Sequence, residues 1–229
     1  MTTVETAILK LDPMLKDLPF TFAFLGGSVL SLLVTDPAAD AIRVTKDVDV
    51  LMDIRTRREY HRLDRMLEQI GFKHDLREDA PICRWIYEDV TVDVLPIRED
   101  VLGWNSKWFD LALGEARTIR CNGRPVRIIS APYFVALKLE AFEDRGKRDF
   151  LMSTDFEDVI CLFNGRASIV EEIAACRHLR RGLAMKFVDY LACHDLEDAV
   201  EGFVQTEDNP AARKEAILSR FRGVAALLS

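Results

Sequence analysis

Two aspartates lie two positions apart in the segment KDVDVLMD, residues 46–53, whose other residues are typical of a buried strand. Because side chains alternate across a strand, Asp47 and Asp49 would project from one face, and Val48 and Val50 from the other. Two like charges on one face repel each other and are costly to desolvate unless a cation lies between them. An isolated pair of this kind fits an exposed edge strand with solvated acids as well as a cation site. The rest of the chain has to decide between the two.

The composition is that of a globular chain. Its 229 residues suffice for one large or two modest domains, and 49% of them are apolar and 30% charged. The net charge of −7 disfavours nucleic-acid binding except through a local basic patch. The five cysteines are never in C-x-x-C spacing, which argues against a zinc site and a disulfide framework. The chain shows no secretory signal and no apolar run long enough to span a bilayer, so we expect a cytoplasmic protein without membrane association.

Patterning around the first glycines predicts a strand that turns into a helix. Residues 21–25 are typical of a short strand ending in Gly26-Gly27, and Ser28 is expected to cap the helix that follows. A polar stretch, residues 35–46, then leads into the acidic strand. We expect this stretch to form an extra loop.

Further along, the patterns predict one amphipathic helix and two hairpins, over residues 55–71, 82–95 and 117–129. From Ser130 onward helical periods dominate, and Thr154-x-x-Glu157 is the pattern of a capping box that opens a helix. Asn164-Gly165 would close that helix. The sequence therefore predicts an α+β fold, with a β-sheet and flanking helices over residues 1–130 and a helical domain over residues 131–229.

Asp93 is a second acid in an otherwise apolar strand, TVDVLP. If that strand pairs beside the one with Asp47 and Asp49, three carboxylates converge on one face of one sheet. Such an oxygen-rich group suits Mg²⁺ or Mn²⁺. Two ions held about 4 Å apart can clamp the attacking and the leaving oxygen of a nucleotidyl transfer. The alternative for Asp93 alone is the solvated face of a hairpin.

The turn Gly26-Gly27-Ser28 has the properties that a phosphate ligand of such a site requires. Glycine lets the backbone approach a ligand closely, and amides at a helix N-terminus favour anionic oxygens. Strand-to-helix turns also use glycine and a serine cap for purely structural reasons. The phosphate-binding interpretation of the turn is favoured because the turn precedes the acidic strand.

Together, Gly27-Ser28, Asp47-Val48-Asp49-Val50 and Val92-Asp93-Val94 resemble the signature of the DNA polymerase β-like nucleotidyltransferase superfamily. The resemblance implies a nucleotidyltransferase-type mixed sheet in which the glycine-serine turn, here Gly26, Gly27 and Ser28, holds the triphosphate of an NTP. It also implies that Asp47, Asp49 and Asp93 bind Mg²⁺ or Mn²⁺ and that Asp93 helps to activate the acceptor. The 18 residues between Ser28 and Asp47 exceed the usual gap of the family.

Two cations lie near the centre of the apolar side of the helix expected after Ser130. Lys138 and Arg145 are two turns apart there, and burying them is costly without anionic partners. One interpretation buries only their aliphatic stems. The other directs the charges toward the triphosphate or the acid cluster, in which case Lys138→Ala should weaken NTP binding and change stability little.

The run KLEAFEDRGKRDFLMSTDFEDVI, residues 138–160, also resembles a narrower group, the AbiEii/AbiGii-type stand-alone nucleotidyltransferases, some of which are toxins. The matching polar positions of that run are Lys138, Arg145, Asp149, Asp155 and Asp158. In this comparison Lys138 contributes to catalysis, and Lys138, Arg145 and Asp158 contribute to nucleotide binding. Asp155 is more simply a helix-dipole partner, whereas Asp158 could pair with the lysine.

We therefore expect a metal-dependent nucleotidyltransferase that moves an NMP from an NTP to an acceptor and releases pyrophosphate. An RNA such as tRNA, a protein or a small molecule would suit as acceptor. The protein could be the toxin of a toxin–antitoxin pair, with an antitoxin as partner. The alternative is a catalytically inactive protein of the same fold that binds a nucleotide or a partner. A metal-dependent hydrolase is less attractive because the four histidines lie outside the motifs.

Overall fold

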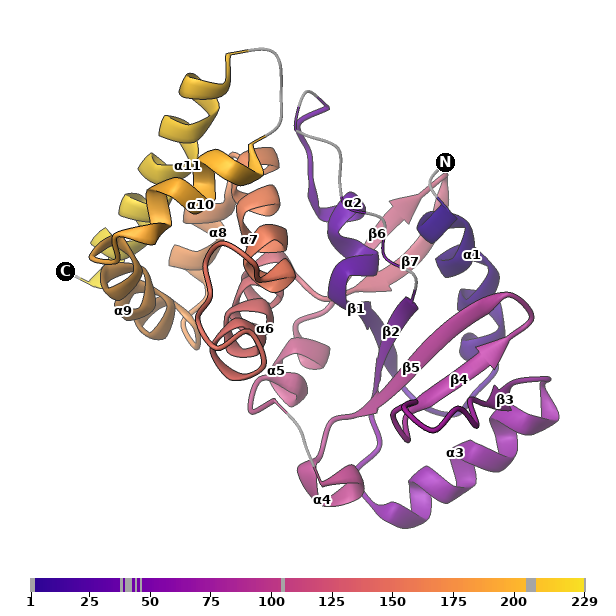
Figure 1. Ribbon diagram of the computed structural model, residues 1–229. Helices are drawn as coiled ribbons and strands as arrows, with labels where there is room; N and C mark the ends of the chain where they lie inside the picture. The colour runs from indigo at the N-terminus through magenta and orange to yellow at the C-terminus, as the bar shows by residue number, and fades with distance from the viewer. Residues whose placement is uncertain are drawn as a thin grey trace. The chain divides into compact units, whose positions relative to one another are not determined.

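The computed structural model describes residues 3–37, 39, 43, 45, 47–103, 106–204 and 209–228. The chain divides into two compact units (Figure 1). The first consists of Met1–Val29 and Val44–Ser130, and the second of Leu30–Arg43 and Ala131–Ser229. Each unit is described by itself below.

The first unit is built on a seven-stranded mixed sheet of order β3-β4-β5-β2-β1-β7-β6. The strands are β1 (Phe22–Leu25), β2 (Asp47–Met52), β3 (Lys73–His74), β4 (Arg84–Tyr87), β5 (Val90–Pro96), β6 (Arg117–Cys121) and β7 (Arg124–Ile128). The central pair β2–β5 is parallel, as is β1–β7, and the remaining neighbours are antiparallel. The helical elements of this unit are α1 (Thr3–Lys16), η1 (Gly26–Val29), α3 (Arg57–Gln69), α4 (Glu99–Leu102) and α5 (Phe109–Gly114).

Apolar side chains on one face of the central strands form the core of this unit. Val48 and Val50 of β2 pair in register with Val92 and Val94 of β5, and all four are buried. Trp85 of β4 pairs with Val92 and is also fully buried. Since side chains alternate along a strand, the residues between these belong to the opposite face.

The second unit is helical in its described part. Its helices are α2 (Leu30–Leu33), α6 (Ala131–Asp144), α7 (Thr154–Gly165), α8 (Ile169–Ala175), α9 (Arg180–Leu191), α10 (Asp195–Phe203), α11 (Pro210–Ala225) and the short η2 (Ala226–Leu228). Aromatic rings fill its core, and several neighbouring ring centroids lie 4.8–4.9 Å apart. The rings with these spacings belong to Phe142, Phe150, Phe156, Phe163, Phe187 and Phe221.

A segment between β1 and β2 belongs to this helical unit. The backbone N–H groups of Thr35 and Asp36 donate to the carbonyl oxygen of Gly165 at 2.8 and 2.9 Å. Arg213 of α11 forms an ion pair with Asp36 at 2.6 Å. Beyond these contacts, part of the predicted loop (residues 38, 40–42, 44 and 46) lies outside the described residues, and its described residues form neither helix nor strand.

The predicted α+β class, with a mixed sheet in the N-terminal part and helices in the C-terminal part, is confirmed. Both predicted hairpins form, as β4–β5 and β6–β7, and the predicted amphipathic helix is α3. The predicted cap at Thr154 is wrong. Ser153 caps α7, because its side chain accepts from the N–H of Phe156, and Thr154 is the first helical residue.

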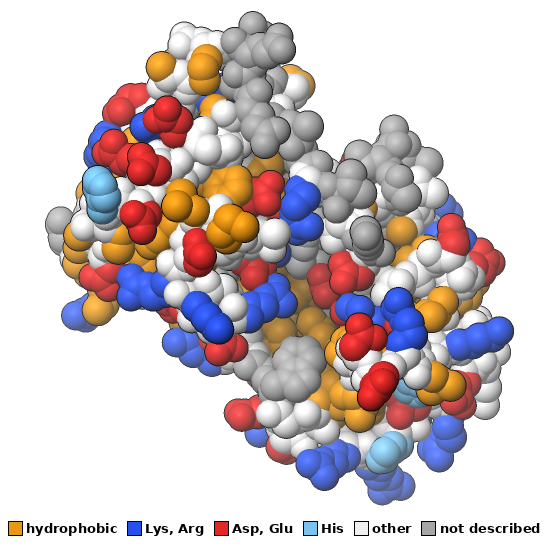
Figure 2. Space-filling model, in the orientation of Figure 1, with side chains coloured by type: hydrophobic (Ala, Val, Ile, Leu, Met, Phe, Trp, Pro, Cys, Tyr) orange, Lys and Arg blue, Asp and Glu red, His pale blue; other side chains and the backbone are white. Residues whose placement is uncertain are grey.

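Charged side chains of both signs are interspersed on the face drawn in Figure 2. Among the described helices, none is both long enough and apolar enough to cross a membrane. The five cysteines are free thiols, in agreement with the expected absence of a disulfide framework.

Replacing Ser153 with alanine tests the assignment of the helix cap. Ser153→Ala should lower the free energy of unfolding by about 0.5–2 kcal/mol, because the Phe156 N–H loses its side-chain acceptor. Thr154→Ala is the matched control and should change it by less than about 0.5 kcal/mol, since Thr154 is exposed. Urea unfolding of both variants gives the comparison. A larger loss of unfolding free energy for Thr154→Ala than for Ser153→Ala would indicate that Thr154 caps the helix, as predicted from sequence.

Candidate active site

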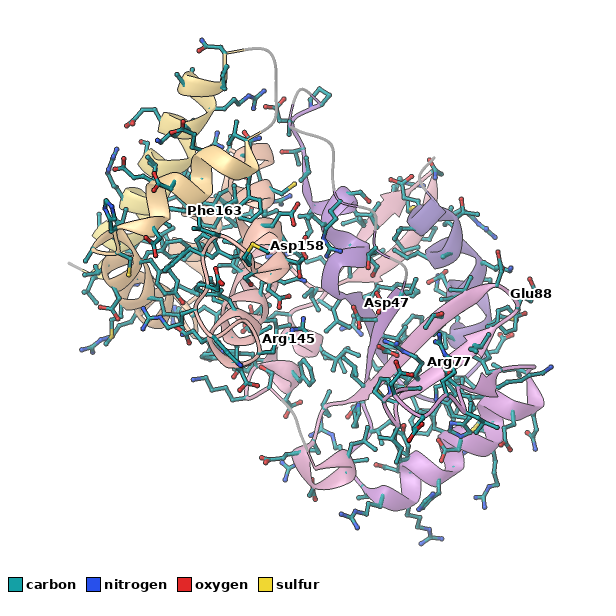
Figure 3. The ribbon with its side chains drawn as sticks, viewed as in Figure 1. Asp47, Arg77, Glu88, Arg145, Asp158 and Phe163 are labelled. Atoms are coloured by element: carbon teal, nitrogen blue, oxygen red, sulfur yellow. The ribbon has the colours of Figure 1, made fainter. Side chains whose placement is uncertain are left out.

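The three acids of the sequence motifs lie on one face of two neighbouring strands. In the parallel pair β2–β5, Asp49 is in register with Asp93, and Asp47 is two residues before Asp49 on the same face. Asp93 is buried, and Asp47 and Asp49 are half-buried. Figure 3 labels Asp47, the first residue of β2. The three acids therefore lie on one face of adjacent strands, as expected, and their binding of a shared metal ion stays a prediction.

Arg84 continues this row onto a third strand. It pairs in register with Asp93 in the antiparallel hairpin β4–β5. Its Nε donates to Asp93 Oδ1 at 2.7 Å and its Nη2 to Asp93 Oδ2 at 2.6 Å. The same Nη2 lies 3.2 Å from Asp47 Oδ2, so one guanidinium joins two of the acids. Hydrogen bonding to Asp93 raises the pKa of Arg84 above its ordinary value, so the guanidinium is charged at any ordinary pH.

Sequence reasoning missed Arg84, although the chain contained a signal for it. A two-residue turn at Glu88-Asp89 fixes the register of the hairpin and places Tyr87 opposite Val90. Counting back along both strands from that turn puts position 84 opposite position 93. An arginine directly across from a buried aspartate predicts an ion pair.

The glycine turn touches the acidic strand. Leu25, the last residue of β1, pairs with Asp49, and the turn η1 follows immediately. Gly26 has φ +70°, and a Cβ at this position would lie 1.9 Å from Asp49 Oδ2. Only glycine therefore allows this backbone to lie against the Asp49 carboxylate.

Ser28 does not cap a helix as expected. It lies inside η1, is almost fully buried, and its hydroxyl donates to the carbonyl oxygen of Leu25 at 2.8 Å. This hydrogen bond ties the turn back to the end of β1. The hydroxyl is therefore already engaged within the turn.

The donor types at the acid face fit a divalent cation. Three carboxylates supply only oxygen atoms, the ligands that Mg²⁺ and Mn²⁺ prefer. Within the described part of the chain, however, no three side chains of the His, Cys, Asp or Glu type are grouped closely enough to hold a metal ion. Arg84 supplies the positive charge that the paired acids require. Metal binding by these acids would need the ion pairs of Arg84 with Asp93 and Asp47 to open.

Lys138 and Arg145 belong to a second charged cluster, which lies inside the helical unit. Figure 3 labels two residues of this cluster, Arg145 and Asp158. Lys138 is buried, and its Nζ lies 3.0 Å from Asp155 Oδ1 and 2.6 Å from Asp158 Oδ2. Arg145 holds the other oxygen of Asp155 through Nε at 2.8 Å. The expected pairing of Asp158 with the lysine is thus present, and Asp155 is more than a helix-dipole partner.

The pKa shifts of this cluster follow from its ion pairs. Burial by itself would lower the pKa of Lys138, but the charges of Asp158 and Asp155 outweigh it and raise that pKa. Burial would likewise raise the pKa of Asp155, but hydrogen bonds from Arg145 and Lys138 lower it. Lys138 and Asp155 are therefore both charged at neutral pH. Any approach of Lys138 to a triphosphate stays a prediction.

No protein-family model and no curated protein sequence matches the chain. Among solved structures, it is similar to an antigenic nucleotidyltransferase-like protein from Paracoccidioides brasiliensis, with a TM-score of 0.54 and 20% identity over 89% of this chain and 94% of that one. It is also similar to the antibiotic-resistance factor ANT(2'')-Ia, with a TM-score of 0.45 and 16% identity over 77% of this chain and 96% of that one. The first similarity shows that the chain has a nucleotidyltransferase-like fold.

Replacing Gly26 tests the close approach of the turn to Asp49. Gly26→Ala should lower the melting temperature, because its Cβ would overlap the carboxylate and φ +70° is strained for alanine by about 1–2 kcal/mol. Gly114→Ala is the matched control in the same unit, since nothing lies within 4 Å of its added Cβ. A melting temperature for Gly26→Ala equal to that of wild type would contradict the described turn.

Replacing Lys138 tests the charged cluster of the helical unit. The ion pairs reverse the effect expected from sequence: Lys138→Met should cost about 3–5 kcal/mol of unfolding free energy, because it removes the nearest cation of the buried Asp158 carboxylate and one of the two cations that hold Asp155. Arg145→Met is the control and should cost about 1 kcal/mol or less, since its side chain is 71% exposed. Urea unfolding measures both. Adding Asp158→Asn to Lys138→Met should recover part of the loss, and equal losses for the two single variants would contradict this assignment.

Proposed function

We propose that the protein is a metal-dependent nucleotidyltransferase that transfers an NMP from an NTP to an acceptor and releases pyrophosphate. The observation that carries the proposal is the register of Asp49 with Asp93 on parallel strands, with Gly26 lying directly against the Asp49 carboxylate. Three acids and a glycine turn that are far apart in sequence are neighbours in the fold. The nucleotidyltransferase-like fold of the chain supports the same conclusion.

In this proposal Asp47, Asp49 and Asp93 hold Mg²⁺ or Mn²⁺. When bound, such an ion offsets the charge of the triphosphate and polarises its oxygens. The backbone N–H groups of Gly27 and Ser28 would bind the β- and γ-phosphates beside the acids. The Ser28 hydroxyl would take part only by leaving the Leu25 carbonyl.

The transfer itself exchanges one P–O bond for another. An oxygen of the acceptor bonds to the α-phosphorus as the bond from that phosphorus to the oxygen bridging to the β-phosphate breaks. Pyrophosphate leaves with the electron pair, and the Asp93 carboxylate takes the proton of the acceptor hydroxyl. Reactions of this kind depend on positioning and charge more than on covalent chemistry.

The resemblance to the AbiEii/AbiGii-type enzymes supports a nucleotide-binding role for Lys138, Arg145 and Asp158. In the structure the lysine and the aspartate neutralise each other within the helical unit. Their contribution is therefore first to hold α6 against α7. A contact of Lys138 or Arg145 with the triphosphate rests on the resemblance alone.

The acceptor is proposed by class. A hydroxyl group on an RNA such as tRNA, on a protein side chain or on a small molecule would suit the same chemistry. Action as a toxin, with an antitoxin as binding partner, would follow if the acceptor is an RNA or protein that the cell needs. These alternatives differ in which cellular fraction becomes labelled.

A second candidate is a catalytically inactive protein of this fold that binds a nucleotide or a partner. One specific observation favours it: Arg84 forms ion pairs with Asp93 and Asp47 and so offsets their charge. If that ion pair is permanent, the acids are structural. The experiment below separates the two candidates.

Labelling with each α-³²P NTP tests the proposed reaction. The protein is incubated with Mg²⁺ and, separately, with total RNA, total protein or small hydroxylated metabolites. We expect one fraction to take up label, and Asp49→Asn to abolish uptake while leaving the fold intact, because the substitution keeps the shape but removes the charge. Asp89→Asn is the matched control, since Asp89 is an exposed acid of the same unit that pairs with Lys10.

Near-normal labelling by Asp49→Asn would place the chemistry elsewhere. Nucleotide binding without label transfer to any fraction, in both wild type and Asp49→Asn, would favour the inactive binding protein.

A further inference from the structure

We propose that Arg84 is an internal cation that a divalent metal ion has to displace, so that the acid face stays closed until the metal binds. The inference rests on the proposed function, because it concerns the same three acids. It assigns to Arg84 a role in regulating access to the site.

The position of one nitrogen atom carries the inference. Arg84 Nη2 lies 2.6 Å from Asp93 Oδ2 and 3.2 Å from Asp47 Oδ2. A cation shared by these two carboxylates has to contact an oxygen of each, and the nitrogen stands between the two oxygens. Metal and guanidinium therefore cannot both occupy this position.

The remaining contact of Arg84 adds to the competition. Its Nε engages Asp93 Oδ1, so both oxygens of Asp93 accept from the same guanidinium. Bidentate pairs of this kind are among the strong charge-assisted hydrogen bonds. The pair is sheltered, since the side chains of Arg84 and Asp93 are only 22% and 10% exposed. A divalent ion gains contacts there only by breaking this pair and overcoming a like charge.

The nearby acid Asp75 does not offer Arg84 an equivalent second position. Its carboxylate is held by Arg77, whose Nε lies 2.9 Å from Oδ1 and 3.0 Å from Oδ2. A displaced Arg84 would thus not find Asp75 free and would turn toward solvent or toward an anionic ligand. The exchange is favourable only when the incoming ion brings enough charge, which selects divalent over monovalent cations.

Calorimetric titration with Mn²⁺, without nucleotide, tests the inference independently of activity. Arg84→Met should bind Mn²⁺ about ten- to a hundredfold more tightly than wild type, since the charge-assisted contacts of Arg84 with Asp93 and Asp47 no longer have to be broken. Arg55→Met is the matched control, an arginine of the same unit whose ion pairs are with Asp53 and Asp110, and should leave the affinity unchanged. Asp93→Asn should lose binding. Arg84→Lys keeps the charge and serves as a second variant in case Arg84→Met does not fold. Its Mn²⁺ affinity should lie between those of wild type and Arg84→Met.

A second measurement follows the guanidinium directly. In ¹⁵N spectra the Nε–H of Arg84, assigned by its loss in Arg84→Lys, should exchange slowly with water in the metal-free protein and much faster at saturating Mg²⁺. Unchanged exchange would mean that Arg84 stays on Asp93 when the metal binds, and would overturn the inference. Equal or weaker Mn²⁺ binding by Arg84→Met would also overturn it.

The two proposals fail in distinguishable ways. Tighter Mn²⁺ binding by Arg84→Met without any label transfer would support the displacement of Arg84 by the metal and contradict the proposed transferase activity. Label transfer with unchanged Mn²⁺ affinity in Arg84→Met would support the proposed transferase activity and contradict the displacement of Arg84 by the metal. If neither wild type nor Arg84→Met binds Mn²⁺, the acids do not form a metal site and both proposals fall.

Discussion

The neutralisation of buried carboxylates is the constraint on which the sheet depends. Asp49, Asp93 and Arg84 form one row across three neighbouring strands, at the level where β1 ends and the glycine turn begins. Without the guanidinium, the central strands would carry repelling charges on a half-buried face. Without the acids, the arginine would lose the carboxylates with which it pairs. The apolar face of the same strands is filled by Trp85 and valines, all of them buried.

The helical unit meets the same constraint with a different residue. Lys138 lies among aromatic and aliphatic side chains of α6, yet its charge is matched by two aspartates one turn apart on α7. In both units one cation joins two acids. Arg84 joins Asp93 of β5 and Asp47 of β2, and Lys138 joins Asp155 and Asp158 of α7. The difference is exposure: the sheet cluster is partly open to solvent, whereas Lys138 is enclosed. An open cluster can exchange its cation, and an enclosed one serves stability.

Local patterns predicted most of the elements, because turn residues and hydrophobic periodicity act over a few residues. The hairpin at Asn122-Gly123 and the end of α3 at Gly71 are examples, and at both places the residues adopt positive φ. The placement of Asp47, Asp49 and Asp93 on one face of adjacent strands also followed from sequence, through the alternation of side chains along a strand. The partners of the charged residues could not be predicted from sequence. Whether Lys138 meets a phosphate or Asp158, and whether Asp93 meets a metal or Arg84, depends on packing between elements that no short window of sequence contains. The cap of α7 was missed by one position because Ser153 and Thr154 offer equivalent hydroxyls.

The membership of Leu30–Arg43 in the helical unit has a consequence for how the chain is made. Leu30 and Leu33 are buried there, and Thr35 and Asp36 bond to Gly165. On a ribosome the partner of this segment emerges 130 residues after Thr35, which is a delay of roughly 10 s at ordinary elongation rates. During that interval the leucines stay uncovered while the strands on either side are already available for pairing. Because of this interleaved order, all strands of the first unit are synthesised before Gly165, so the first unit can pair its strands while Leu30–Arg43 still waits for its partner.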